Sequence, residues 1–92
     1  MKEYTVKVRE DGSKFWYLDG ELHREDGPAI EWTDGDKEWY LDGKLHREDG
    51  PAVERVDGTK YWYLNGQELT EEEHDGVLME RYWEAKLKGK NA

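Results

Sequence analysis

Two identical tetrapeptides carry the residues best suited to chemistry: His23-Arg24-Glu25-Asp26 and His46-Arg47-Glu48-Asp49. A histidine beside carboxylates can bind a metal ion or transfer a proton near neutral pH. Adjacent side chains in an extended loop diverge, however, and active sites are rarely duplicated in register. We therefore favour a structural role, in which arginine pairs with Asp or Glu across the repeat boundary and histidine packs on Trp or Tyr. A metal site and a contact with a partner stay open as alternatives.

Carboxylates also recur at a fixed offset, and on a sheet they would form a regular acidic lattice. Such a lattice can imitate a nucleic-acid backbone, although the arginines between the acids count against mimicry. The alternative is a solvated surface that keeps an aromatic-rich domain soluble. The recurring pairs are Asp19 and Asp42, Glu25 and Glu48, Asp26 and Asp49, Glu31 and Glu54, and Asp34 and Asp57.

No other motif predicts catalysis or a cofactor. Asp34-Gly35-Asp36 lacks the twelve-residue calcium-loop pattern and is interpreted as a turn. Ser13 is the only serine and has no adjacent His-Asp arrangement. The chain contains no cysteine, which excludes disulfides and cysteine-based zinc sites. We expect a protein without enzymatic activity, cofactor or metal.

The tetrapeptides belong to a longer repeat. Residues 16–35 and 39–58 are identical at 16 of 20 positions, and the tripeptide Trp-Tyr-Leu recurs at residues 16, 39 and 62, a spacing of 23. A period between about 20 and 50 residues is typical of repeat architectures. We predict a single domain over residues 1–92, with repeats at about 14–36, 37–59 and 60–70, and a C-terminal cap over 70–88.

Paired Asp-Gly dipeptides predict how each repeat folds. Those at residues 11, 34 and 57 separate short β-prone runs, which is a strong signal for a β-hairpin. The sequence predicts a mainly β fold: an antiparallel β-meander of 23-residue hairpin repeats. The expected strands are residues 3–9, 14–18, 28–33, 37–41, 51–56 and 60–64.

Alternation along each strand separates two faces. One carries the Trp and Leu of each Trp-Tyr-Leu tripeptide, and we predict that this column is the core. The opposite face carries Tyr17, Tyr40 and Tyr63. Tyrosine has an apolar body and a polar tip, so this column either covers the sheet or binds a partner.

The tail departs from the repeat. Thr70 and Glu73 form a capping-box pattern, and an apolar stripe from Leu78 to Leu87 has helical spacing, so we predict a C-terminal capping helix. An alternative aligns residues 75–81 with 49–55 and makes the tail another strand.

Composition limits the partners. The net charge is −9, which disfavours nucleic acid and the cytoplasmic membrane surface and favours basic proteins. No apolar run is long enough for a membrane span, and the N-terminus lacks the apolar stretch of a signal peptide. The expected compartment is the cytosol. We also expect that the edge strand near residues 3–9 can pair with a second copy, giving a homodimer.

The repeat resembles MORN (membrane occupation and recognition nexus) repeats, in the variant form found in bacteria and phages. These have about 23 residues, an aromatic strand, Asn-Gly or Asp-Gly, and then a histidine. The matching positions are Trp16, Tyr17, Gly20, His23 and Gly27, then Trp39, Tyr40, Gly43, His46 and Gly50, then Trp62, Tyr63 and Gly66. The third copy has no histidine in register, and His-Arg-Glu-Asp-Gly replaces the usual His-Gly-x-Gly.

The resemblance implies a protein-interaction module, and some bacterial members are labelled antitoxins. We therefore expect a small acidic protein that binds and inhibits a partner protein, such as an antitoxin or a phage counter-defence inhibitor. A nucleic-acid mimic and a small-ligand-binding protein are the alternatives. Tyr40→Ala combined with Tyr63→Ala should weaken partner binding. The predicted binding residues are Tyr17, Tyr40, Tyr63, Asp19, Asp42, Glu31, Glu54, His23, His46, Arg24 and Arg47.

Overall fold

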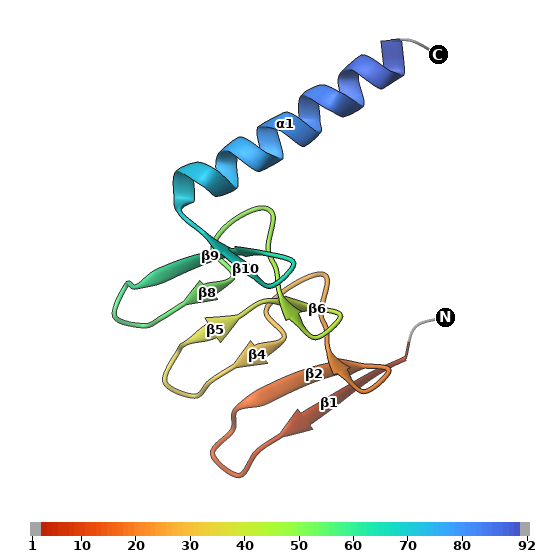
Figure 1. Ribbon diagram of the computed structural model, residues 1–92. Helices are drawn as coiled ribbons and strands as arrows, with labels where there is room; N and C mark the ends of the chain where they lie inside the picture. Colours follow the sequence, from red (N-terminus) through yellow and green to blue (C-terminus); the bar gives the residue numbers. More distant parts are fainter. Residues whose placement is uncertain (1–2, 91–92) are drawn as a thin grey trace.

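The computed structural model describes residues 3–90, and side chains are described for residues 3–88. The described chain forms ten short strands followed by one helix (Figure 1). The elements are β1 (Tyr4–Val8), β2 (Lys14–Leu18), β3 (Glu21–Leu22), β4 (Ile30–Glu31), β5 (Lys37–Glu38), β6 (Tyr40–Leu41), β7 (Lys44–Leu45), β8 (Val53–Glu54), β9 (Lys60–Leu64), β10 (Gln67–Leu69) and α1 (Glu71–Lys90).

The main sheet is antiparallel throughout, in the order β1-β2-β4-β5-β8-β9-β10. β3 pairs with β2, and β6 with β7 form a separate two-stranded hairpin. The predicted mainly β fold, a meander-like antiparallel sheet with a C-terminal helix, is confirmed. The short strands β3, β7 and β10 were not predicted: after each Trp-Tyr-Leu the chain turns back and pairs with itself before continuing.

Two kinds of turn join the strands. Where strands were predicted to form hairpins, an Asp side chain accepts a hydrogen bond from the backbone N–H two residues on, as in Asp11 with Ser13 and Asp57 with Thr59, both at 2.9 Å. These hydrogen bonds lower the pKa of both carboxyls below the ordinary value. The turns after Trp-Tyr-Leu have positive φ at both central residues, such as 52° at Asp42 and 77° at Gly43. That geometry explains the Asp-Gly and Asn-Gly pairs.

The prediction that the column of Trp and Leu side chains forms the core holds for Leu64, which is buried, but not for the tryptophans. Trp16, Trp39 and Trp62 are only half-buried. The described chain measures 54 × 36 × 17 Å, and the sheet in Figure 1 has no second layer stacked on it, so no layer closes over the indoles. Buried apolar side chains come mostly from the opposite face and from small residues beside the Trp column. They are Phe15, Ala29, Ile30, Ala52, Val53 and Leu64.

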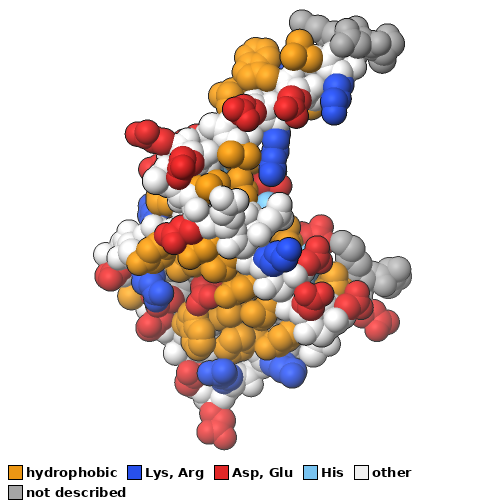
Figure 2. Space-filling model, in the orientation of Figure 1, with side chains coloured by type: hydrophobic (Ala, Val, Ile, Leu, Met, Phe, Trp, Pro, Cys, Tyr) orange, Lys and Arg blue, Asp and Glu red, His pale blue; other side chains and the backbone are white. Residues whose placement is uncertain are grey.

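On the opposite face, Phe15 is covered by side chains from two other parts of the chain. Trp32 meets the Phe15 ring edge-on, with ring centroids 5.3 Å apart, and the Arg9 guanidinium lies 4.7 Å from the Phe15 ring centroid. Phe15 pairs with Ile30 in the sheet register, which brings these two buried side chains together. Figure 2 shows hydrophobic side chains gathered over the middle of the sheet with charged side chains around them.

Helix α1 begins at the predicted capping box. The Thr70 N–H donates to Glu73 Oε1 at 2.8 Å, and the Glu73 N–H donates to Thr70 Oγ1 at 3.1 Å. The helical interpretation of the tail is therefore confirmed, and the extra-strand alternative is wrong. Only the first turns pack on the sheet, and the outer part projects beyond it (Figure 1). The predicted stripe is thus largely exposed; its most exposed members are Met79, Tyr82, Trp83 and Leu87. Within residues 3–90, no helix has both the length and the apolar character to cross a membrane.

Candidate functional site

The two repeated histidines act as hydrogen-bond acceptors for the next repeat. His46 Nδ1 accepts from the Asn65 N–H and His23 Nδ1 accepts from the Asp42 N–H, both at 2.9 Å. Both rings are buried. A neutral ring that accepts at Nδ1 carries its proton on Nε2, which lies 3.2 Å from Glu48 Oε2 in the case of His46. His23 Nε2 lies in the same way 3.3 Å from Glu25 Oε2.

Main-chain bonds complete each junction between repeats. The Gly66 N–H donates to Leu45 O at 2.8 Å, and the Arg47 N–H donates to Tyr63 O at 3.2 Å. The corresponding bonds recur 23 residues earlier, from Gly43 to Leu22 and from Arg24 to Tyr40. Each His-Arg dipeptide therefore joins its own repeat to the next and provides partners for the backbone groups at the junction.

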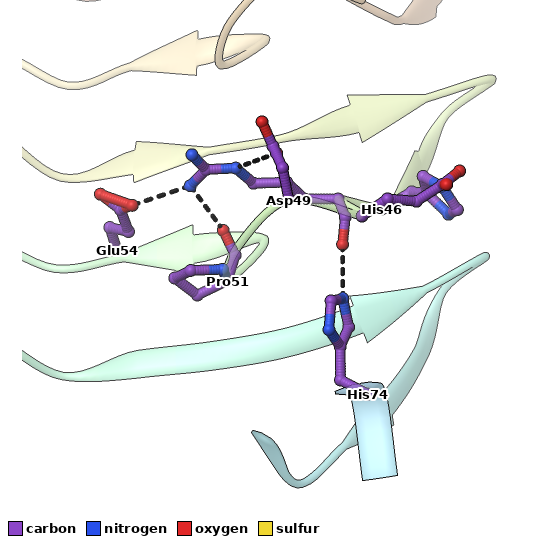
Figure 3. Close-up of polar contacts among 7 residues, drawn as sticks. His46, Asp49, Pro51, Glu54 and His74 are labelled. Carbon is purple, nitrogen blue, oxygen red and sulfur yellow. Dashed lines mark hydrogen bonds and ion pairs between the residues drawn. The ribbon is translucent and has the colours of Figure 1, made fainter. Parts of the chain in front are cut away.

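The arginines hold the loop of their own repeat. The Arg47 guanidinium lies 3.8 Å from the Trp39 ring centroid, and its Nη1 donates to Pro51 O at 3.1 Å and to Glu54 Oε2 at 2.8 Å (Figure 3). Its Nε donates to Asp49 at 2.9 Å. These ion pairs lie within one repeat, so the expected pairing across the repeat boundary is wrong.

Arg24 makes the same set of contacts one repeat earlier, although more loosely. It stacks 3.9 Å from the Trp16 ring centroid and donates to Asp26 at 3.1 Å and to Pro28 O at 3.2 Å. Its ion pair with Glu31 is 3.9 Å long, against 2.8 Å for the equivalent pair one repeat later. The tetrapeptides thus have a structural role in the folded chain.

A third histidine, which sequence reasoning missed, attaches the helix to the sheet. His74 on α1 is 1% exposed, and its Nε2 donates to Arg47 O at 2.6 Å (Figure 3). It stands outside the register of the other two histidines, so aligning the repeats gives no signal for it. Residues four apart lie on the same face of a helix, so His74 shares the face of Leu78. That spacing was the one sequence signal that His74 would point toward the sheet.

The tyrosine column, which we call the Tyr face, makes contacts within the chain. Tyr40 donates to Glu38 Oε1 at 3.0 Å, and burial, with the nearby Glu38 charge, raises the pKa of its phenol to about 12. Burial and then the Glu68 charge also raise the pKa of Tyr63. Lys7 Nζ lies 5.1 Å from the Tyr17 ring centroid. These rings are half-buried and not freely presented.

An open groove runs along the Trp side of the sheet, from β1 to α1. It consists of three adjoining hollows of about 420, 540 and 320 Å³, which contain Trp16, Trp39 and Trp62 respectively in their walls. The first and second hollows share Glu25 and Asp26, and the second and third share Glu48 and Asp49. We call this feature the Trp groove.

The rim of the Trp groove is acidic. Each repeated tetrapeptide, with the glutamate that pairs with its arginine, has three carboxylates against one guanidinium. The Asp26 and Asp49 side chains are each 87% exposed, and those of Glu25 and Glu48 are 54% and 62% exposed. A half-buried indole beside exposed carboxylates suits a ligand group that is both cationic and aliphatic.

The predicted binding residues do not lie on one surface. Arg24, Arg47 and His46 line the Trp groove, whereas the tyrosines lie on the Tyr face. Glu31 and Glu54 hold the two arginines. Asp19 and Asp42 occupy the positive-φ positions of turns. The groove itself was not predicted, because it depends on the indoles remaining half-buried, with an arginine stacked on Trp16 and another on Trp39.

No group of three or more His, Asp or Glu side chains in the described part of the chain is arranged to hold a metal ion. Comparison with models of protein families, with curated proteins and with solved structures finds no match to this chain.

Proposed function

We propose that this chain is a small protein-interaction module that binds a segment of a partner protein along the Trp groove. The observation that carries the proposal is the row of three neighbouring hollows, each with an indole in its wall and exposed carboxylates at its rim. Trp is enriched among the residues that dominate binding energy at protein interfaces. The net charge of −9 would also speed the approach of a basic partner.

The groove is supported in a way that reduces the free-energy cost of binding. Hydrogen bonds to His23 and His46 fix the turns at Asp42 and Asn65, and Arg24 and Arg47 fix the position of two of its indoles. A surface that is ordered before binding loses little conformational entropy when a partner docks. This preorganisation favours the groove over the outer part of α1 as the primary binding surface.

Inhibition of the partner is the second part of the proposal. It rests on the resemblance of the repeats to MORN-variant proteins of bacteria and phages, some of which are labelled antitoxins. Binding along the groove would cover a basic segment of the partner and block its use. The arginines that lie among the groove carboxylates argue against mimicry of a phosphate backbone, because a phosphate mimic gains nothing from paired cations.

Affinity capture from the native host tests this proposal with three forms of the protein. The groove variant combines Glu25→Gln with Glu48→Gln, which removes two rim charges and keeps an acceptor for each histidine. The Tyr-face variant combines Tyr40→Ala with Tyr63→Ala. We expect the wild type and the Tyr-face variant to retain the same partner and the groove variant to lose most of it, with folding checked by circular dichroism.

Two results would overturn the proposal. Capture by the groove variant together with loss by the Tyr-face variant would move the binding site to the tyrosines. Failure of the wild type to retain any protein partner at stoichiometric levels would remove the interaction module itself.

A further inference from the structure

The Trp groove has a regular internal spacing. Trp16 lies on β2, Trp39 directly follows β5, and Trp62 lies on β9. In the strand order β2-β4-β5-β8-β9, each of these positions is two strands from the next. Adjacent strands lie about 4.8 Å apart, so equivalent points in successive hollows are about 9.6 Å apart.

Peptide conformations differ in how well they match this spacing. A polyproline II helix rises about 3.1 Å per residue with three residues per turn, so every third side chain points the same way at intervals of about 9.3 Å. In a β-strand, side chains on one face recur about every 6.6 Å. In an α-helix, side chains that point in the same direction recur every seven residues, or about 10.5 Å. Polyproline II is thus the closest match and stays within about 1 Å of register over three hollows.

The chemistry of each hollow selects the side chain that should enter it. Glu25 with Asp26 and Glu48 with Asp49 place exposed carboxylates where neighbouring hollows meet. Asp75, whose side chain is 75% exposed, adds a carboxylate to the wall of the third hollow. Arg24 and Arg47 already lie against Trp16 and Trp39, and Lys60 lines the third hollow. Carboxylates outnumber these cations in the wall of every hollow. A ligand lysine or arginine would therefore place its aliphatic stem along the exposed part of an indole and its cation beside a carboxylate.

We infer that the groove binds an extended basic segment in the polyproline II conformation, with Lys or Arg at every third position. This inference rests on the proposed function and specifies the partner's binding segment. About seven residues, Lys-x-x-Lys-x-x-Lys, would reach across all three hollows. The right-handed twist of a sheet, about 20–25° per strand, turns successive rims relative to one another. The long, flexible stem of lysine spans that offset.

Synthetic peptides test the inference directly, with fluorescence anisotropy as the measurement. The peptide KPPKPPK has the proposed spacing, and KKKPPPP has the same composition and charge with the lysines clustered. We expect KPPKPPK to bind the wild type at least about fivefold more tightly, because the clustered lysines reach the rim of only one or two hollows. Binding should weaken as salt increases, because the rim ion pairs are solvent-exposed.

Two matched variants separate the groove from overall charge. Glu25→Gln with Glu48→Gln removes two rim charges, and Glu10→Gln with Asp34→Asn removes two charges from residues that line none of the hollows described above. The groove variant should bind KPPKPPK about five- to tenfold more weakly, as expected for the loss of two partly exposed ion pairs. The control variant should bind it as the wild type does.

Each other outcome overturns a defined part of the reasoning. Equal binding of both peptides, lost in the groove variant, would refute the three-residue spacing and leave the proposed function intact. Equal weakening by both variants would refute the groove as the peptide site. No peptide binding would refute the inference; the proposed function would then stand only if the groove variant also loses the captured host partner.

Discussion

Gly50 lies against the guanidinium of Arg47, and replacing it with alanine should displace that side chain. A Cβ at Gly50 would lie 2.9 Å from Arg47 Cζ and 3.1 Å from Nη1. The backbone at Gly50 is outside the left-handed region, so alanine introduces no strain in φ. The effect of Gly50→Ala therefore depends on how firmly the guanidinium is held.

The contacts of the guanidinium set the magnitude. Arg47 is long and flexible, so it can move aside, and the loss is limited to what it gives up. Its stacking on Trp39 contributes about 0.5–1 kcal/mol. Its bonds to Pro51 O and Glu54, on a side chain that is 20% exposed, contribute about 0.5–1 kcal/mol each. Alanine also lowers the conformational entropy of the unfolded chain, which offsets about 0.4–1 kcal/mol of this loss of stability. We expect Gly50→Ala to lower the free energy of unfolding by about 1–2 kcal/mol.

A double-mutant cycle isolates this contact. Arg47→Ala alone should lower the free energy of unfolding by about 2 kcal/mol, since it removes the same interactions. In the Arg47→Ala background the new Cβ meets no guanidinium, and Gly50→Ala should then stabilise the fold by about 0.4–1 kcal/mol. Urea denaturation of the four proteins measures the coupling, which should be about 1.4–3 kcal/mol in favour of the double variant.

Gly27→Ala provides a matched control in the preceding repeat. Its Cβ would lie 3.1 Å from Arg24 Cζ, and the Arg24–Glu31 ion pair is 3.9 Å long, so a more loosely held side chain yields more easily. We expect a smaller loss of stability than for Gly50→Ala. Equal destabilisation by Gly50→Ala with and without Arg47 would refute the reasoning, because the alanine would then conflict with the surrounding backbone.

Substitutions at three further positions test other parts of the fold. His46→Ala should lower the free energy of unfolding by about 2 kcal/mol, measured in urea, because it removes the acceptor for the Asn65 N–H and leaves a small cavity; an unchanged urea midpoint would contradict this role. Tyr40 has its pKa raised from 10.0 to about 12, so the folded state retains the phenol proton longer than the unfolded state. Its stabilisation is complete below pH 10 and is lost as the pH rises to 12, so the urea midpoint should fall more steeply over that range in the wild type than in Tyr40→Phe; parallel curves would contradict this. Thr70→Ala should lower the free energy of unfolding by about 1 kcal/mol and Thr70→Ser by much less, because serine still accepts from the Glu73 N–H; similar losses in both would exclude the side-chain cap.

Local signals explain why most of the fold could be predicted. The Asp-Gly and Asn-Gly turns act over two residues, and the Thr70–Glu73 capping box acts over four, so neither depends on distant packing. The core could not be predicted in the same way. Alternation separates Trp16 from Phe15 but does not say which face is covered, and Phe15 is covered by Trp32 and Arg9 from distant or non-strand parts of the chain.

The site was harder to predict than the fold because its key contacts join side chains to distant backbone. His46 Nδ1 accepts a hydrogen bond from the Asn65 N–H, 19 residues away. Every non-proline residue has a backbone N–H, so residue types do not indicate which N–H the histidine will bind. Arg47 was expected to pair across the repeat boundary, but it pairs with Glu54 of its own repeat, because the folded loop also stacks it on Trp39. The groove is a consequence of the same stacking.

The junctions between repeats use groups that the first two copies both supply: a histidine ring and main-chain N–H and C=O groups. An inserted duplicate of residues 37–59 would therefore find the same partners on both sides as the original segment does. Such a duplication would lengthen the Trp groove by about 9.6 Å, enough for three more residues of a bound peptide. The next basic residue of a bound peptide would already be held close to the added hollow. The affinity of the whole peptide would therefore rise through a further contact of the same kind. Duplication of one segment is thus a direct evolutionary or engineering route to longer-reaching versions of this protein.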